Sequence, residues 1–195
     1  MRFQLDKKSA LIIVDVQNDF CPGGALPVPN GDEVVPILNE YIKKFKEAEA
    51  SIYATRDWHP VNHMSFKTRG GIWPPHCVQN TRGAEFHPNL TLSPKTKVIS
   101  KGLDPDKEAY SGFEGTDLRE ELKKRGIEKV FVGGLATDYC VKNTVLDALK
   151  LGFKAVILED AVRGVDVKPG DSEKALEEMV KKGAKKAVLS EILGP

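Results

Sequence analysis

One arrangement recurs along the second half of the chain: an amphipathic helix rich in basic residues, then a glycine, then a short apolar strand. It appears as ELKKRGIEKVFVGG, as DALKLGFKAVILED and as MVKKGAKKAVLSE. A glycine directly after a helix provides the left-handed conformation that ends it, and lysine in the last turn complements the helix dipole. Gly126, Gly152 and Gly183 are therefore predicted to follow the ends of helices.

The strand segments in this arrangement are almost continuously apolar, which is typical of parallel strands covered on both faces. They are Val130 to Val132, Ala155 to Leu158 and Ala187 to Leu189. The first half of the chain also alternates strands with a helix. ALIIVDV is a predicted strand, a helix is predicted over about residues 32–50, and SIYATRD and TKVIS are predicted strands. In that helix an apolar stripe recurs every three or four residues, at Val35, Leu38, Ile42 and Phe45.

Six strands alternating with helices predict an α/β fold with a doubly wound, mostly parallel six-stranded sheet and helices on both faces, a Rossmann-like three-layer α/β/α arrangement. A length of 195 residues fits one domain spanning residues 1–195. The free edge strands of such sheets often form subunit contacts, so the sequence is compatible with a homo-oligomer.

Composition excludes several classes of partner. The 29 basic and 28 acidic residues give a net charge of +1, so the chain lacks the basic field used to bind nucleic acid or an anionic membrane. Three cysteines without CxxC spacing suit neither a disulfide framework nor a zinc knuckle. No signal-peptide pattern and no apolar stretch of roughly 20 residues is present. We therefore expect a cytoplasmic protein whose partner is a small molecule.

The segment 57–95 is too long for an ordinary connection, and loops of this length are usually functional or disordered. It contains both tryptophans and all four histidines of the chain, which a solvated linker has no reason to concentrate. Because ligands of open α/β sheets bind beyond the carboxyl ends of the strands, where this loop begins, we expect it to form a metal- and substrate-binding region.

Two imidazoles and a carboxylate in this loop suggest a metal site. Asp57, His59 and His76 suit one divalent metal ion, with Zn²⁺ preferred and Fe²⁺ or Mn²⁺ as alternatives. Three protein ligands leave positions open for water or substrate, as in catalytic sites. His63 has three possible roles: a fourth metal ligand, a residue that contacts the ligands, or a loop histidine that bonds to the backbone. The last of these roles fits His87 best.

Three further residues follow predicted strands and could take part in chemistry. Asp15 follows ALIIV and Lys101 follows TKVIS, although a strand-end Asp often only forms a turn and a lone lysine is often only solvated. Cys140 falls in the first turn of a predicted helix, with Thr137 or Asp138 as N-cap. That position favours a thiolate and lowers the thiol pKa, but buried structural cysteines are also common.

The sequence motifs around these residues together resemble those of the nicotinamidase (pyrazinamidase) branch of the isochorismatase-like cysteine hydrolases. ALIIVDVQNDFCPGGALPV and GLATDYCV mark the superfamily, and RDWHPVNHMSF with WPPHC marks the amidase branch more narrowly. The resemblance implies a catalytic triad of Asp15, Lys101 and Cys140. It also implies metal ligation by Asp57, His59 and His76, and a cis peptide before Ala136, whose N–H joins that of Cys140 in an oxyanion hole.

The resemblance further implies hydrolysis of nicotinamide to nicotinate and ammonia in NAD salvage, and of pyrazinamide, through a cysteine thioester. Phe20 and Trp73 are expected to flank the substrate ring. The nearest alternative is another hydrolase of the family, an isochorismatase or an N-carbamoyl amidase, which is not expected to carry the DWHPxNH and WPPHC pair. A non-catalytic nucleotide-binding module is a further alternative, but the turn GGLATDYC is not GxGxxG and no P-loop occurs.

Overall fold

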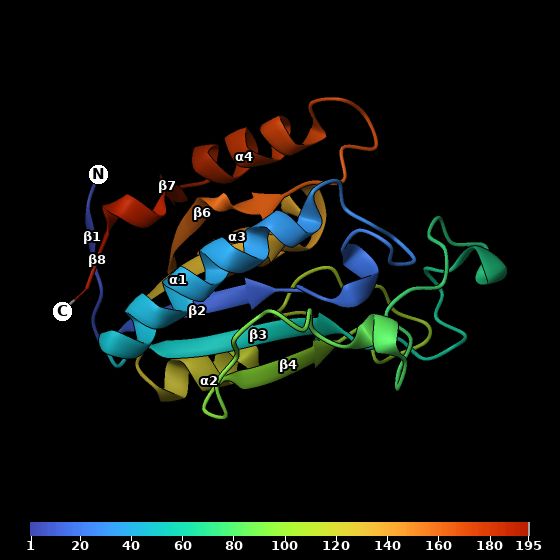
Figure 1. Ribbon diagram of the computed structural model, residues 1–195, viewed down its shortest axis with the longest axis horizontal. Helices are drawn as coiled ribbons and strands as arrows, with labels where there is room; N and C mark the ends of the chain where they lie inside the picture. The colour runs from blue at the N-terminus through green and yellow to red at the C-terminus, as the bar shows by residue number, and fades with distance from the viewer. Residues whose placement is uncertain (195) are drawn as a thin grey trace.

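The computed structural model describes residues 1–194 and contains a six-stranded sheet in which every neighbouring pair of strands is parallel (Figure 1). Its order is β4-β3-β2-β5-β6-β7, so the predicted doubly wound sheet is confirmed. The strands are β2 (Ser9–Val14), β3 (Ser51–Asp57), β4 (Lys97–Lys101), β5 (Lys129–Leu135), β6 (Lys154–Arg163) and β7 (Lys185–Ala187).

Helices cover both faces of the sheet, as the apolar strands require (Figure 1). They are α1 (Val34–Glu47), α2 (Leu118–Lys124), α3 (Lys142–Lys150) and α4 (Asp171–Lys181). The predicted first helix is shorter than expected, because residues 31–33 form a 3₁₀ turn and the last helical residue is Glu47. The predicted helix-ending glycines 126, 152 and 183 all have positive φ.

Strand β2 shows how one run of apolar residues serves two cores. All six of its residues are buried, with Leu11 and Ile13 packed in the cluster that includes α1. Ala10, Ile12 and Val14 point to the opposite face, into the cluster that includes residues of α2, α3 and α4. Because successive side chains of a strand alternate between faces, a strand in the middle of three layers needs apolar residues for both faces, which residues 10–14 provide.

The order of the strands changes direction at the centre of the sheet. From β2 the chain builds β3 and β4 on one side and then returns to build β5, β6 and β7 on the other. The direction of winding therefore reverses between the neighbouring strands β2 and β5, and ligands of open α/β sheets bind at the carboxyl ends of strands at such a point. The predicted residues Asp15 and Cys140 follow these two strands.

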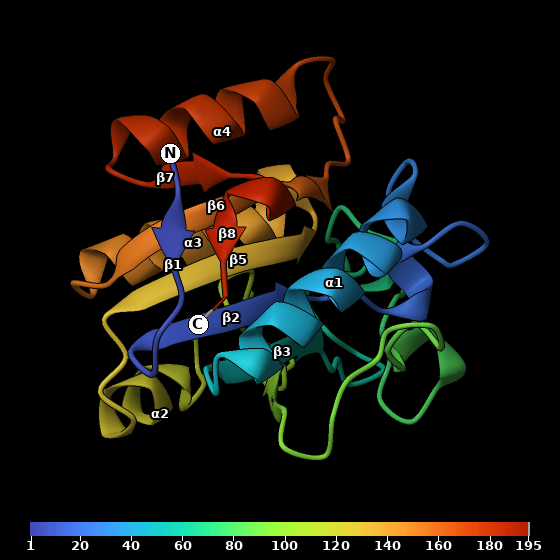
Figure 2. The ribbon, with the colours of Figure 1, turned by 60° about the vertical axis from the view of Figure 1, so that its left-hand side comes forward.

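A second, two-stranded sheet was not predicted. It pairs β1 (Phe3–Gln4) with β8 (Ile192–Leu193) in parallel and brings the two ends of the described chain together (Figure 2). Strands of two residues carry no periodicity, so sequence patterns cannot reveal them.

Most of the long connection between β3 and β4 lies beyond the carboxyl ends of the strands, and its last residues return along the sheet to the start of β4 (Figure 1). It contains 3₁₀ turns at Lys67–Arg69 and Arg82–Ala84, and isolated bridges join His59 to Val78 and Phe66 to Trp73. The loop is therefore held by its own contacts in a fixed arrangement. No helix within residues 1–194 has the length and apolar character to cross a membrane.

Candidate active site

Three predicted residues meet at the carboxyl ends of three strands. Asp15 directly follows β2, Lys101 is the last residue of β4, and Cys140 lies in the turn after β5. All three are buried. The Lys101 Nζ lies 2.8 Å from Asp15 Oδ2 and 3.5 Å from Cys140 Sγ. The structure thus brings together the acid, the amine and the thiol.

The two oxygens of the Asp15 carboxylate have different partners. Its backbone has a φ of 51°, and its N–H donates to Thr55 O at 3.1 Å. The Thr55 hydroxyl donates to Oδ1 at 2.7 Å, whereas Oδ2 faces the Lys101 ammonium at 2.8 Å. Ligand atoms of Asp15 and Cys140 lie within 4.8 Å of each other. Oδ2 is therefore available to accept the thiol proton.

Burial dominates the electrostatics of this cluster. It raises the pKa of Asp15, although the charge of Lys101 opposes the change. Burial also raises the pKa of the Cys140 thiol well above its usual range; Lys101 opposes this, while Asp15 and Asp57 add to it. The expected lowering of the thiol pKa is therefore wrong for this arrangement, because burial of the thiol, together with the nearby carboxylates of Asp15 and Asp57, outweighs the charge of Lys101. The thiol keeps its proton until an acceptor takes it.

The local backbone at Cys140 also differs from the expected helix start. Residues Thr137–Val141 form a π-helical turn, and α3 begins only at Lys142. The N-cap position is Ala136, without a side-chain cap, so the predicted capping by Thr137 or Asp138 is wrong. The peptide bond between Leu135 and Ala136 is cis, as the resemblance implied.

The carboxylate of Asp138 does not cap its own helix but bonds to another loop. Oδ1 accepts the N–H of Val165 and Oδ2 that of Asp166, both at 2.9 Å. Because Val165 lines the cavity above Cys140, Asp138 fixes one wall of that cavity. No sequence spacing could have indicated a contact between residues 27 positions apart.

We expect Asp138→Asn to lower the melting temperature by roughly 2–8 °C, since one of two charge-assisted bonds is lost at a cost of about 1–2 kcal/mol. The loosened wall should raise KM severalfold. Asp171→Asn is the matched control, because Asp171 accepts the Lys168 N–H at 2.9 Å in the same loop but does not line the cavity. Thermal unfolding and steady-state kinetics measure both effects, and an unchanged KM in Asp138→Asn would contradict the assignment.

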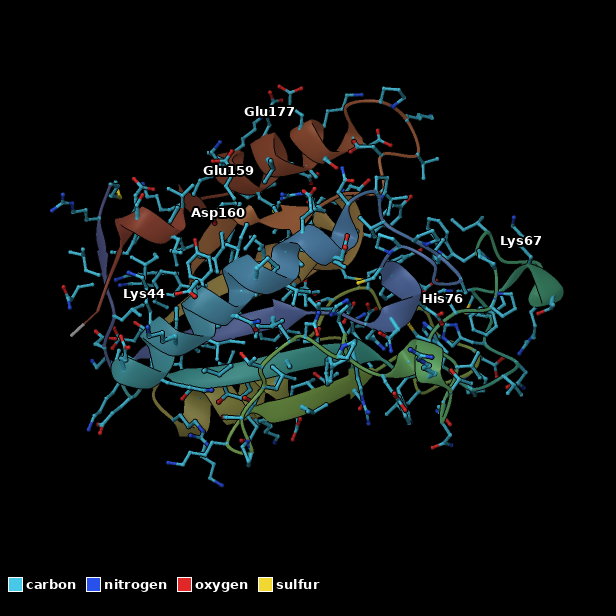
Figure 3. All side chains as sticks on the ribbon, in the orientation of Figure 1. Lys44, Lys67, His76, Glu159, Asp160 and Glu177 are labelled. Atoms are coloured by element: carbon cyan, nitrogen blue, oxygen red, sulfur yellow. The ribbon has the colours of Figure 1, made fainter. Side chains whose placement is uncertain are left out.

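The three predicted metal ligands converge beside the triad. Ligand atoms of Asp57, His59 and His76 lie within 4.8 Å of one another, and all three side chains are buried. Asp57 Oδ2 is 3.4 Å from His59 Nε2 and 3.9 Å from His76 Nε2, while Oδ1 bonds to Lys101. The metal-binding atoms thus face one point, and His76 lies at the carboxyl end of the sheet (Figure 3).

The hydrogen bonds of these histidines fit a metal site. His59 Nδ1 lies 3.1 Å from Gly102 O, and His76 Nδ1 lies 2.8 Å from Pro74 O. A carbonyl only accepts, so each Nδ1 carries the proton and each Nε2 keeps a lone pair for a metal ion. Burial lowers the pKa of His76, which favours the neutral form that binds metals. The donor set therefore fits a divalent ion.

The other two histidines are occupied elsewhere. His63 Nδ1 is 2.7 Å from Ser65 Oγ, and Nε2 is 2.9 Å from Lys107 O. Its ring packs against that of His59 with centroids 4.0 Å apart, so it supports a ligand and has no nitrogen left to ligate. His87 bonds to the backbone of Asn89 and does not line the cavity.

Aromatic side chains form the walls of the cavity above Cys140. Phe20 and Trp73 line it, and so do Tyr110 and Tyr139, which sequence reasoning missed. The Trp73 indole N–H donates to the Tyr110 hydroxyl at 3.0 Å, and the rings of Trp73 and Tyr139 meet edge to face at 5.1 Å. The cavity therefore suits a flat, mainly apolar ring.

Two polar residues that sequence reasoning also missed anchor the loops around the site. The Gln17 side chain accepts the N–H of Asp57 and donates to its carbonyl, both at 2.8 Å. Asp19 Oδ2 accepts the N–H of Cys77 at 2.8 Å and so fixes the residue next to His76. Both lie in the phrase DVQNDF directly after β2, and their polarity beside a buried strand was the only available signal.

Comparison with known proteins agrees with this geometry. The chain is 43% identical over 196 residues to the nicotinamidase of Escherichia coli, covering 90% of this chain and 92% of that protein. It is 43% identical over 182 residues to the nicotinamidase/pyrazinamidase of Mycobacterium tuberculosis, covering 87% and 93%. The crystal structure of the pyrazinamidase of Pyrococcus horikoshii in complex with zinc is 58% identical, with a TM-score of 0.89 over 93% of this chain and 99% of that one.

The family relationship extends over nearly the whole chain. The isochorismatase domain family matches residues 9–188, which includes the six strands of the central sheet up to Ala187 and all the residues of the site described above. The arrangement of the strands and the overall similarity of the sequence lead to the same conclusion: the chain belongs to the isochorismatase family.

Proposed function

We propose that the chain is a nicotinamidase, which hydrolyses nicotinamide to nicotinate and ammonia and acts on pyrazinamide in the same way. The observation that carries the proposal is the contact of Lys101 with both Asp15 and Cys140, directly beside the Asp57, His59 and His76 cluster. Relatives named nicotinamidase or pyrazinamidase match most of this chain at 43% and 58% identity. Nicotinamide is uncharged and flat, which suits the aromatic cavity.

Asp57, His59 and His76 would hold one divalent ion, and the zinc bound to the Pyrococcus horikoshii protein supports Zn²⁺. When bound, the ion supplies a positive charge that can hold the ring nitrogen of the substrate. Phe20 and Trp73 would flank the ring. Such orientation of the carboxamide towards Cys140 can contribute a large part of the rate, because a held substrate reacts as though intramolecular.

The first half of the reaction forms a thioester. Asp15 takes the proton of the Cys140 thiol, and the sulfur adds to the carboxamide carbon. The N–H groups of Ala136 and Cys140 would stabilise the resulting oxyanion, and losing one such donor typically costs about 10²–10³ in rate. Lys101 balances the negative charge of the cluster; burial works to lower its pKa, but Asp15 and Asp57 hold the pKa well above its usual range.

Asp15 then protonates the leaving nitrogen, the C–N bond breaks and ammonia departs. A water molecule next gives a proton to Asp15 and adds to the thioester carbon. As the C–S bond breaks, the thiolate leaves, and the proton on Asp15 returns to the sulfur. The products are nicotinic acid, which ionises to nicotinate, and the free enzyme, so one amide and one water are consumed for each ammonia released.

Ammonia release from nicotinamide and pyrazinamide by metal-loaded protein tests the proposal directly. Release from neither would refute it, and release from an N-carbamoyl substrate alone would favour the other amidase branch. Equilibrium binding of NAD tests the non-catalytic alternative, which requires tight binding without turnover.

A separate prediction concerns the metal site. We expect His59→Ala to lose bound metal and to raise KM for nicotinamide more than about tenfold, because even indirect contacts of a metal site typically contribute 10–100-fold. His87→Ala is the control, since His87 lies outside the cluster. Metal analysis and steady-state kinetics measure the outcome, and a His59→Ala protein with full metal content would refute the ligand assignment.

The compartment and the class of partner are part of the same proposal. Cys21, Cys77 and Cys140 are free thiols, which agrees with a reducing compartment, and we place the enzyme in the cytoplasm. We propose nicotinamide as its partner, without nucleic acid or membrane.

A further inference from the structure

The ammonium of Lys101 lies inside a cage of four acceptor atoms. It bonds to Asp57 Oδ1 and lies 2.8 Å from Asp15 Oδ2, 3.2 Å from Ala109 O and 3.5 Å from Cys140 Sγ. The side chain of Lys101 is buried, so its partners come from the protein. A lysine ammonium has three N–H bonds, so the cage offers one acceptor more than the ammonium has donors.

The side-chain atoms of this cage form a cluster of metal ligands. Ligand atoms of Asp15, Asp57 and Cys140 lie within 4.8 Å of one another, and among residues 1–194 only the metal cluster already described meets the same condition. Two carboxylates and a thiolate are ligands that Zn²⁺ accepts, and Ala109 O would complete the usual four. Zinc binds such ligands at about 2.0–2.3 Å, so they would close in by roughly 1 Å on an ion that replaced the ammonium.

The two clusters share Asp57. Its Oδ2 faces His59 Nε2 at 3.4 Å and His76 Nε2 at 3.9 Å, whereas its Oδ1 bonds to Lys101. Enzymes with two-metal sites hold their ions about 3.5–4 Å apart, a spacing that one carboxylate can bridge. The chain therefore has the ligands of a two-metal site, with an ammonium in the second position.

Charge does not exclude a second ion once Lys101 is removed. A divalent ion carries one positive charge more than the ammonium, and a thiol releases one proton when it becomes a metal ligand. Exchanging the ammonium for an ion on Cys140 therefore leaves the net charge of the site unchanged. Without either cation, the buried carboxylate of Asp15 would lose its compensating charge, which is strongly unfavourable.

We propose that Asp15, Asp57 and Cys140 form a second metal site, which Lys101 closes so that a divalent ion binds beside the nucleophile and not to it. A thiolate that ligates a metal ion shares its lone pair with the ion and cannot add to a carbonyl carbon. Its proton has gone to solvent, so Asp15 has none to pass to the leaving nitrogen. The ammonium supplies positive charge at the same point and leaves the sulfur free.

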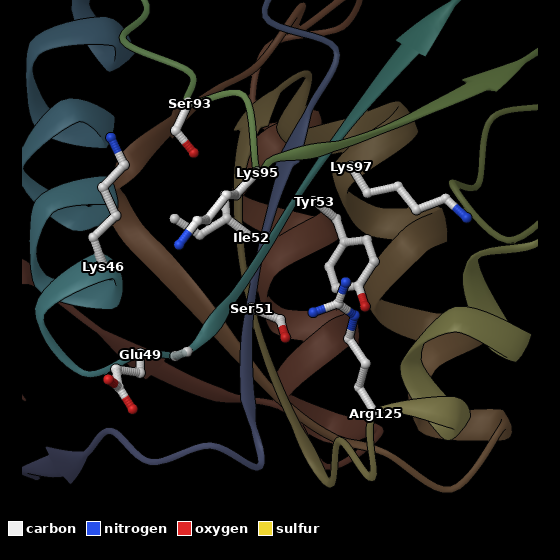
Figure 4. Close-up of a pocket in the computed structure, with 10 residues that line it drawn as sticks. Lys46, Glu49, Ser51, Ile52, Tyr53, Ser93, Lys95, Lys97 and Arg125 are labelled. Atoms are coloured by element: carbon white, nitrogen blue, oxygen red, sulfur yellow. The ribbon is translucent and has the colours of Figure 1, made fainter.

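Lys97, the first residue of β4, forms an ordinary ion pair for comparison. Its ammonium lies 2.7 Å from Asp117 Oδ2 and 3.1 Å from Glu121 Oε1, and its side chain is 33% exposed beside a cavity at the start of β3 (Figure 4). Asp117 and Glu121 belong to no metal-ligating cluster of residues 1–194. Removing this lysine should therefore create no metal site, which makes Lys97→Ala the matched control.

Cobalt binding followed by absorption spectroscopy tests the proposal, because a bond between Co²⁺ and a thiolate gives a charge-transfer band in the near ultraviolet. We expect the wild type and Lys97→Ala to bind Co²⁺ without this band. Lys101→Ala should show the band and bind one more ion per chain than the wild type. The second ion should bind at least about a hundredfold more tightly to Lys101→Ala, because the wild type has a positive charge at the same point. The double variant Lys101→Ala/Cys140→Ala should lose the band.

Thermal melting checks the fold of the variants. Lys101→Ala should melt below the wild type without metal, because the buried carboxylates lose their cation. Co²⁺ should raise its melting temperature more than that of the wild type. Refolding with Co²⁺ present gives the same spectroscopic test if the metal-free variant does not fold.

The wild type provides a second test that needs no variant. Once one equivalent of Zn²⁺ is bound, further Zn²⁺ should not slow alkylation of Cys140 by iodoacetamide, measured by mass spectrometry. Protection of Cys140 by a second equivalent would overturn the proposal. So would a Lys101→Ala protein without the thiolate band or with the ion count of the wild type, and so would a band that persists in the double variant. These measurements report metal binding, so their outcome does not depend on nicotinamide being the substrate.

Discussion

Replacing Cys140 with alanine is expected to reduce nicotinamide turnover by on the order of 10⁴-fold or more, because the reaction loses the atom that forms its covalent intermediate. The methyl group of alanine cannot form a thioester, and no other thiol lines the cavity. Mass spectrometry of acid-quenched enzyme should detect the nicotinoyl adduct in the wild type and none in the variant. Substrate binding should remain, since the proposed metal and aromatic contacts are untouched.

Cys21→Ala provides the matched control. Cys21 is also buried, and burial raises its pKa to about 11, but it does not line the cavity. We expect this variant to keep the adduct and most of its activity. Cys140→Ala should retain its full metal content. A Cys140 variant that loses the metal, or that still forms the adduct, would contradict the role of nucleophile.

The elements of this fold could be predicted from local patterns, but their arrangement could not. SIYATRD corresponds to β3 residue for residue, and the glycines after the helices adopt the predicted conformation. A continuous apolar run indicates a strand buried on both faces, yet it does not identify the neighbouring strand. The end of β6 shows the limit, because the apolar run is interrupted by Glu159 and Asp160 but the strand continues to Arg163.

The active site could also be predicted only in part. Asp15, Lys101 and Cys140 could be placed together because each lies at or after the end of a strand, and parallel strands end at one edge of the sheet. The contacts that support these residues could not be predicted in this way. Asp138 was expected to cap its own helix and instead bonds to Val165, and Tyr110 comes from a loop without periodicity. Such contacts depend on how loops fold back over the sheet, which residue spacing does not encode.

The second large effect is expected for Asp15→Asn, which keeps the shape of the side chain and removes its ability to take a proton. General acid–base catalysis typically contributes 10²–10⁴-fold, so we expect kcat to fall within about that range. Alkylation of Cys140 by iodoacetamide should slow as well, since the buried thiol has lost its proton acceptor. Thr55→Val is the control: it removes the bond to Oδ1 but leaves Oδ2 and its ion pair with Lys101 in place, so a loss of at most about tenfold is expected.

The pH profile separates a proton acceptor from a structural carboxylate. A base works only when ionised, so activity must disappear as the pH falls through the pKa of Asp15. Because burial raises that pKa, the acid limb of kcat/KM should lie above the usual range of an aspartate, and it should be absent from the residual activity of Asp15→Asn. An asparagine variant with more than about a tenth of the wild-type kcat, or with the same acid limb, would show that the thiol proton goes to another group.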